Sequence, residues 1–201
     1  MRITGGTLRS RAIRAPRGQA TRPTSDRVRE ALFGILDSAG RVDGARVLDL
    51  YAGTGALALE AVSRGAVAAA LVESGREALE VARANVAALN VGDRVHVVAS
   101  DVAVVLGRPH GRPPAWLARH GPFDLVLADP PWSLVDAGKV TPVLAALVTC
   151  GALVDVAVVV LEHSSRTPPP DIAGLDREDS RRYGDATLTF YKPAILAPPA
   201  P

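Results

Sequence analysis

Residues 46–55 read Arg-Val-Leu-Asp-Leu-Tyr-Ala-Gly-Thr-Gly, and this stretch decides the fold. Its first six residues are typical of a buried strand, and its glycines permit a tight turn and a close approach of backbone to a ligand. A helix is expected directly afterwards, over 56–64. Ligands of open α/β sheets bind beyond the carboxyl ends of the strands, so the turn within 49–55 predicts a ligand site. The spacing Gly53-x-Gly55-x-x-Ala58 also fits a dinucleotide-binding turn, although an ordinary tight turn can share it.

Apolar runs of strand length alternate with stretches of helical periodicity along the chain. Strands are predicted at 46–51, 67–73, 94–99, 123–128 and 156–161. Helices are predicted at 56–64, 75–89, 101–106 and 139–150. Such alternation is typical of a parallel sheet with right-handed crossovers and with helices on both faces. The last run lacks polar residues, which predicts a strand covered on both faces.

The two ends of this region complete the predicted fold. An amphipathic helix is expected after Thr24-Ser25, and the face opposite its apolar residues carries Arg27, Arg29 and Glu30. Residues 178–192 indicate an antiparallel hairpin around Tyr183-Gly184-Asp185. We therefore predict an α/β domain over 25–192 with a mostly parallel, seven-stranded sheet. A basic arm or hairpin, 1–24, precedes this domain, and a frayed tail, 193–201, follows it.

The length and composition limit the class of protein. A chain of 201 residues can form one well-packed domain, and a single cysteine, Cys150, excludes a disulfide framework. The N-terminus has no apolar signal-peptide run, and no uncharged run reaches the length of a membrane span. A cytoplasmic protein without a membrane partner is therefore expected. The four histidines show no metal-ligand spacing, so no metal is expected either.

Positive charge is concentrated at the N-terminus. Residues 1–29 contain eight arginines and one acid, a net charge of +7, whereas the remaining 172 residues contain 15 basic and 20 acidic groups, a net charge of −5. A basic arm on a mildly acidic body indicates contact with a nucleic acid, although a solubilising tail would have the same composition. The arginines expected to contact RNA are Arg2, Arg9, Arg11, Arg14, Arg17, Arg22 and Arg27.

Acidic residues follow two further predicted strands. Glu73 ends the second strand, where a carboxylate can accept hydrogen bonds from a ribose diol or can simply be solvated. Asp101 follows the third strand, where it can bind an adenine amino group, cap the next helix, or do both.

The sequence Asp129-Pro130-Pro131-Trp132 follows the strand predicted at 123–128. The two prolines fix the backbone and remove two N–H donors, so the turn presents carbonyl oxygens. A carboxylate beside a carbonyl forms an acceptor pair for an exocyclic amine, and an indole ring can stack on a base. The motif therefore predicts a pocket for a flipped-out nucleobase, with a rigid turn around a core tryptophan as the alternative.

These residues resemble the class I S-adenosylmethionine-dependent methyltransferases that modify base amino groups. More narrowly, they are similar to the bacterial guanine-N2 methyltransferases of small-subunit (16S) ribosomal RNA. The resemblance rests on the segments 2–6, 22–33, 49–55, 129–132 and 183–184. The Asp-Pro-Pro-Trp type is shared by many amino methyltransferases, whereas the N-terminal segments are more specific. Tyr51 and Thr54 stand where phenylalanine and serine are expected, and the insert 107–122 looks longer than usual.

The resemblance implies a Rossmann-like fold and methyl transfer from S-adenosylmethionine to the N2 amine of one guanine in 16S ribosomal RNA, the one conventionally numbered 966, during small-subunit assembly. The implied partner is this RNA or an assembly particle, bound by a monomer. The implied cofactor-binding residues are Asp49, Tyr51, Ala52, Gly53, Thr54, Gly55, Glu73, Ser74, Ser100, Asp101 and Val102. The guanine would be held by Asp129, Pro130, Pro131 and Trp132, and the arginines named above would bind RNA.

Three other classes of protein share part of this pattern. A DNA adenine-N6 methyltransferase uses the same acceptor pair, but 201 residues leave little room for a DNA-recognition domain. A non-catalytic RNA-binding assembly factor of the same fold predicts a damaged 129–132 motif or glycine turn, and neither is damaged. A nicotinamide oxidoreductase leaves both the 129–132 motif and the basic arm unexplained.

Overall fold

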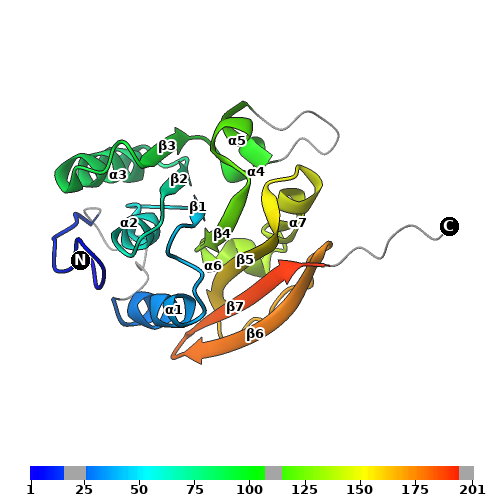
Figure 1. Ribbon diagram of the computed structural model, residues 1–201. Helices are drawn as coiled ribbons and strands as arrows, with labels where there is room; N and C mark the ends of the chain where they lie inside the picture. The colour runs from blue at the N-terminus through cyan, green and yellow to red at the C-terminus, as the bar shows by residue number, and fades with distance from the viewer. Residues whose placement is uncertain (16–25, 107–114, 195–201) are drawn as a thin grey trace.

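The computed structural model describes residues 1–15, 26–106 and 115–194, arranged as in Figure 1. The helices are α1 (Asp26–Ser38), α2 (Ala56–Ser63), α3 (Arg76–Leu89), α4 (Val102–Leu106), α5 (Ala115–His120), α6 (Trp132–Asp136) and α7 (Thr141–Thr149). The strands are β1 (Arg46–Leu50), β2 (Ala68–Glu73), β3 (Val95–Ala99), β4 (Phe123–Ala128), β5 (Leu153–Ser164), β6 (Leu175–Tyr183) and β7 (Ala186–Pro193). Among the described residues, no helix combines the length and apolar character needed to cross a bilayer.

The strands form one sheet in the order β3-β2-β1-β4-β5-β7-β6. The first five strands are parallel, and β7 pairs antiparallel with both β5 and β6. Strand β1 lies between β2 and β4, with Leu48 opposite Ala70 on one side and Val126 on the other. The predicted fold, a mostly parallel seven-stranded sheet with a C-terminal antiparallel hairpin, is therefore confirmed.

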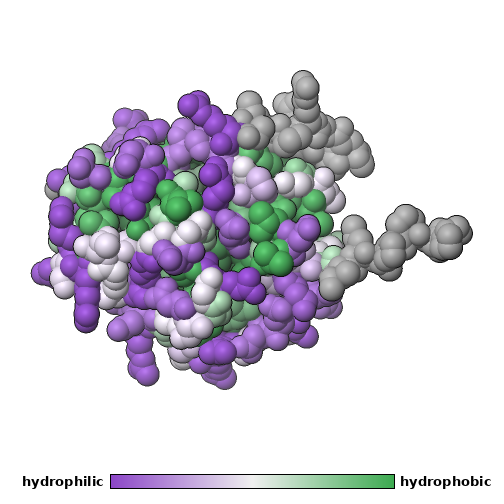
Figure 2. Space-filling model, in the orientation of Figure 1, coloured by the Kyte–Doolittle hydropathy of each residue, from purple (hydrophilic) through white to green (hydrophobic). Residues whose placement is uncertain are grey.

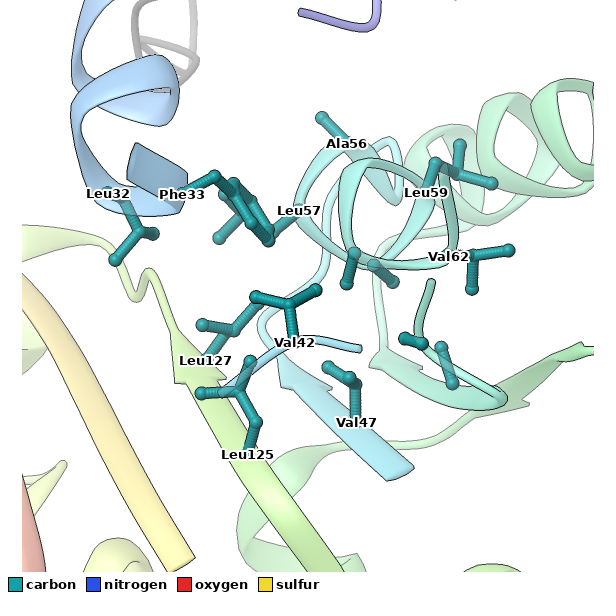
Figure 3. Packing of buried hydrophobic residues seen from close by; sticks show 14 of the residues in the cluster. Leu32, Phe33, Val42, Val47, Ala56, Leu57, Leu59, Val62, Leu125 and Leu127 are labelled. Atoms are coloured by element: carbon teal, nitrogen blue, oxygen red, sulfur yellow. The ribbon is translucent and has the colours of Figure 1, made fainter. Parts of the chain in front are cut away.

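Helices cover both faces of the parallel part of the sheet, and successive strand residues point to opposite faces. One buried cluster joins α1, α2 and α3 to the sheet, and the other lies under α4, α5, α6 and α7. Figure 3 shows the first cluster, where Phe33 of α1 points toward Leu57 of α2, above Leu127 of β4. This packing fixes where α2 starts, and α2 begins directly after the glycine turn.

The boundaries differ from the predictions most in β5, which runs from Leu153 to Ser164 where 156–161 is predicted, and in β6 at the edge of the sheet. Strand β6 begins at Leu175, three residues earlier than predicted, and nearly all of its residues are exposed. It pairs with β7 alone, so no apolar alternation marks it in the sequence. The run 156–161 is not covered on both faces throughout, because Val156 is 69% exposed where the register between β4 and β5 shifts. In Figure 2, hydrophilic residues nonetheless cover most of the visible surface.

Arg29 is not on the solvent face of α1, and this part of the sequence prediction is wrong. Its side chain is fully buried and donates to the carboxylates of Asp26, at 3.0 Å, and Glu60, at 3.3 Å. A third hydrogen bond goes to the carbonyl of Arg2. A buried guanidinium needs such partners, which come from distant parts of the chain and cannot be read from helical periodicity.

The basic N-terminus is folded over residues 1–15 and is called the N-terminal hairpin below. Its backbone pairs Arg2 with Ala12, and the Ile3 amide donates to the Arg11 carbonyl at 3.0 Å. Ile3 and Ile13 are buried in the first hydrophobic cluster. The hairpin is thus packed on the body of the protein, and its arginines are presented from a fixed surface.

Candidate active site

Four acidic residues predicted to bind ligands meet at one edge of the sheet. Asp49 lies near the end of β1, and Glu73 ends β2. Asp101 lies two residues after β3, and Asp129 directly follows β4. These four strands are neighbours and run parallel, so their carboxyl ends share the same edge. The structure therefore brings together the two motifs that the sequence analysis treated separately, the glycine turn and residues 129–132.

Three residues of the glycine turn have positive φ angles, and only two of them are glycines. Tyr51, Gly53 and Gly55 have φ angles of 60°, 55° and 77°. A Cβ on Gly55 would lie 2.5 Å from Cδ2 of Leu71, so glycine is required there for packing against β2. A Cβ on Gly53 would meet no described atom within 4 Å, so this side of the turn is open to a ligand. Tyr51 is not a glycine, so its positive φ angle is strained. Strained backbone of this kind occurs mainly at functional sites.

Asp49 is a buried carboxylate with one oxygen unused. Its Oδ2 accepts a hydrogen bond from the Ala58 amide at 3.0 Å, whereas its Oδ1 has no partner among the described residues. Burial raises the pKa of Asp49 to about 8, and the charges of Asp129 and Glu73 add to this, against the opposing effect of the Ala58 amide. A buried acceptor of this kind fits a cationic ligand group such as an amino acid ammonium. The site thus suits the amino acid end of S-adenosylmethionine.

Glu73 holds the turn in place. Its Oε2 accepts from the Gly53 amide at 2.8 Å, and its Oε1 accepts from the amides of Ser74 and Gly75 at 2.8 and 2.7 Å. A carboxylate has about four lone-pair sites, so these three bonds leave room for about one further hydrogen bond, from a ribose hydroxyl. The simple alternative, a solvated strand-end acid, does not describe this residue.

Asp101 caps α4, which was one of the two roles considered for it. Its Oδ1 accepts from the Ala103 amide at 2.8 Å, and Val102 behind it is buried. Ser100 is tied to the neighbouring strand through its amide, which donates to the Glu73 carbonyl at 2.9 Å. Burial raises the pKa of Tyr51 to about 12, with a further contribution from the charge of Asp101. The hydrogen bond that the structure shows for the Asp101 carboxylate is therefore the helix cap.

Residues 129–132 form a rigid turn from β4 into α6. The Asp129 amide lies 3.4 Å from the Leu50 carbonyl, which sets this turn beside the end of β1. The Pro131 carbonyl accepts from the Leu134 amide at 2.8 Å and is used within α6. The acceptor that remains beside Asp129 is therefore the Pro130 carbonyl. Trp132 is partly exposed at the start of α6, so it is not the fully buried core residue of the alternative reading.

The predicted RNA-binding arginines are exposed on the N-terminal hairpin and on α1, or lie outside the described residues. Arg2, Arg9, Arg11 and Arg14 are exposed on the N-terminal hairpin, and Arg27 is exposed on α1. Arg17 and Arg22 lie outside the described residues.

Two buried polar residues near the site were missed by sequence reasoning. Glu60 accepts hydrogen bonds from the N-terminal hairpin and from two arginines, and Asn85 bonds both the hairpin and the Thr54 carbonyl. A lone acid within the apolar helix Ala56–Ser63 was the available signal for Glu60. No comparable signal exists for Asn85, since α3 carries many polar residues.

The fold and this site define a class I methyltransferase. Residues 1–192 match the family described as "Conserved hypothetical protein 95", and the chain belongs to this family.

Named relatives agree with this class. The chain is 39% identical to "Ribosomal RNA small subunit methyltransferase D" of Escherichia coli K12 over 66% of its own length and 60% of that protein. It is 28% identical to "Putative rRNA methyltransferase YlbH" of Bacillus subtilis over 96% of its length and 98% of that protein. The solved structure "Putative methyltransferase yhhF from Escherichia coli" superposes with a TM-score of 0.80 and 32% identity, covering 98% of this chain and 99% of the other.

Proposed function

We propose that the chain transfers a methyl group from S-adenosylmethionine to the exocyclic N2 amine of one guanine in 16S ribosomal RNA, at the position conventionally numbered 966, during small-subunit assembly. The observation that carries this proposal is the pairing of β1 with β4, which puts the end of β1 next to the end of β4, where residues 129–132 begin. At the end of β1, Oδ1 of Asp49 has no partner among the described residues. One edge of the sheet thus offers a site for a cationic cofactor and a site for an amine. The relatives named as ribosomal RNA methyltransferases support RNA as the substrate.

The cofactor would lie along the carboxyl ends of β1, β2 and β3. Asp49 and the turn 51–55 would hold its amino acid end, Glu73 with Ser74 its ribose, and residues 100–102 its adenine edge. When bound, S-adenosylmethionine supplies a methyl group made electrophilic by the sulfonium. The protein's remaining task on this side is to align that methyl group with the incoming amine.

The guanine amine is a poor nucleophile because its lone pair is delocalised into the ring. Asp129 and the Pro130 carbonyl would accept its two protons in hydrogen bonds, which favours a more tetrahedral nitrogen and offsets the positive charge that develops there. Trp132 would stack on the base, since its indole is partly exposed. Asp129 is also the group placed to take the proton that the amine loses.

The test is methyl transfer from labelled cofactor to small-subunit RNA and to assembly particles from cells that lack the protein. We expect label in one guanine N2 group, mapped by mass spectrometry of nuclease fragments. Label in DNA adenine, or no label in any RNA substrate, would overturn the proposal.

Cofactor binding is expected to release a proton. With a pKa of about 8, Asp49 is mostly protonated at neutral pH in the free protein, whereas a bound ammonium favours the carboxylate. Affinity for S-adenosylhomocysteine should therefore rise with pH, by up to about tenfold per unit below pH 8. Calorimetry at pH 6.5 in buffers of different ionisation enthalpy measures the released protons. The Asp49→Asn variant should release none, and equal release by both proteins would remove Asp49 from this role.

The exposed arginines of the N-terminal hairpin are expected to supply RNA affinity. Replacing Arg9, Arg11 and Arg14 together by glutamine should weaken binding and lower the slope of log K against log salt by about 0.7–0.9 for each arginine that contacts a phosphate. Affinity for cofactor in the absence of RNA should not change.

A matched control removes three exposed charges outside the hairpin, through Arg41→Gln, Arg119→Gln and Arg177→Gln. This control should retain the wild-type salt slope. If the two triple variants had the same slope, the hairpin would not be part of the RNA interface.

A further inference from the structure

Asn85 connects the N-terminal hairpin to the cofactor turn. It lies on α3 and is 1% exposed. Its Oδ1 accepts from the Arg14 amide at 2.7 Å, and its Nδ2 donates to the carbonyls of Arg14 and Thr54, both at 3.1 Å. Both amide hydrogens and the amide oxygen are thus used, and the side chain has no alternative partners to turn to without losing a bond.

The two ends of this connection belong to different proposed sites. Arg14 exposes its guanidinium on the hairpin, while its main chain is held by Asn85. Thr54 lies in the turn 51–55, where three residues have positive φ angles and where the backbone depends on outside contacts for its shape. On the other side of the same turn, Glu73 holds the Gly53 amide. The turn is therefore clamped from β2 by Glu73 and from α3 by Asn85.

The hairpin is also tied to the helix that begins directly after the turn. The amides of Thr4 and Gly5 donate to Glu60 at 2.8 and 2.7 Å, and the Leu8 amide donates to Oγ of Ser63 at 2.9 Å. Both acceptors lie on α2. The hairpin therefore cannot shift relative to α2 and α3 without loss of buried hydrogen bonds.

We propose that Asn85 is a positioning residue that couples RNA binding at the hairpin to cofactor binding at the turn. RNA bound to the hairpin restrains the Arg14 main chain, which holds the Asn85 amide and through it the Thr54 carbonyl. RNA and cofactor then favour the same docked arrangement of the hairpin and the turn, and this gives positive cooperativity without a change of fold. The inference rests on the proposed function, because it takes the hairpin as the RNA-binding surface.

The test measures the affinity for S-adenosylhomocysteine, which cannot transfer a methyl group, with and without saturating 16S ribosomal RNA transcribed in vitro. In the wild-type protein RNA should tighten binding by about fivefold or more, and S-adenosylhomocysteine should tighten RNA binding by the same factor. In Asn85→Ala both factors should fall below about twofold. If Asn85→Ala bound both ligands more weakly but kept the wild-type coupling factors, Asn85 would have only a structural role.

A second pair of variants keeps the Asn85 side chain and changes its partner. Arg14→Gln removes the guanidinium and keeps the amide donor, whereas Arg14→Pro removes both. Both variants should bind RNA less tightly, but only Arg14→Pro should lose the coupling factor. This pair decides the question if Asn85→Ala does not fold, which circular dichroism would reveal.

The outcomes separate this inference from the proposed function. Methyl transfer to RNA without any coupling in the wild-type protein, or with equal coupling in Arg14→Gln and Arg14→Pro, would overturn the inference alone. A wild-type protein that neither binds nor methylates this RNA, free or in assembly particles, would overturn both.

Discussion

Replacing Asp129 by alanine is expected to lower the rate of methyl transfer by about 10²–10³-fold, the cost of removing one preorganised group that stabilises developing charge. The carboxylate follows β4 at the same edge as the glycine turn, and the Pro130 carbonyl beside it cannot offset positive charge on the amine as a carboxylate does. Single-turnover transfer from labelled cofactor measures this step directly.

Cofactor affinity is measured in the same variant to show that the lower rate comes from the lost contact with the amine. The charge of Asp129 raises the pKa of Asp49, so its removal makes ionised Asp49 easier to form. Affinity for S-adenosylhomocysteine at neutral pH should therefore be unchanged or higher in Asp129→Ala. The variant Asp129→Asn keeps an acceptor oxygen without the charge and should fall between the other two proteins in rate.

The matched control is Asp155→Ala, which removes an exposed carboxylate near the start of β5, at the opposite edge of the sheet. It should transfer methyl groups at the wild-type rate. Turnover by Asp129→Ala within about tenfold of wild type would contradict the proposed role of the carboxylate.

The largest expected effect on stability comes from Glu60. Its side chain is fully buried and accepts five hydrogen bonds, from the Thr4 amide and hydroxyl, the Gly5 amide, and the Nε atoms of Arg29 and Arg64. After replacement by alanine, the carboxylate that still pairs with the buried Arg29 guanidinium is that of Asp26, which is largely exposed. Breaking a buried ion pair in this way costs about 3–5 kcal/mol. Urea unfolding at pH 7 measures the loss.

An exposed ion pair of the same chemistry serves as the control. Glu80 pairs with Arg76 on α3 at 3.2 Å, with both side chains mostly exposed. Glu80→Ala should change the free energy of unfolding by no more than about 1 kcal/mol. Adding Arg29→Met to Glu60→Ala should recover part of the stability, because the uncompensated buried charge is then gone. A loss below about 1 kcal/mol for Glu60→Ala would contradict the ion-pair interpretation.

The order of strands and helices could be predicted because most of these elements have a recognisable local sequence pattern. The buried strands have apolar runs of fixed length, and α2 follows a turn whose glycines are required by positive φ angles and by contact with Leu71. The carboxyl ends of parallel strands share one edge in every such sheet, so Asp49, Glu73, Asp101 and Asp129 could be assigned to that edge, although their proximity depends on the strand order. The start of strand β6 was predicted less accurately, because the strand is exposed and, among the described residues, pairs on one side only.

By itself, the sequence determined the α/β class, the glycine turn and the set of acids at the carboxyl edge, since each depends on residues close together in the chain. Only the tertiary structure decided that Arg29 is buried and that Asn85 joins Arg14 to Thr54. It also decided that Asp49 has a raised pKa and an oxygen without a partner in the described part of the chain. The physical reason is that burial and hydrogen-bond partners depend on which distant segments pack together. The N-terminal arginines show this most clearly, because five of the six in the described part of residues 1–29 are exposed, whereas Arg29 stabilises the interior.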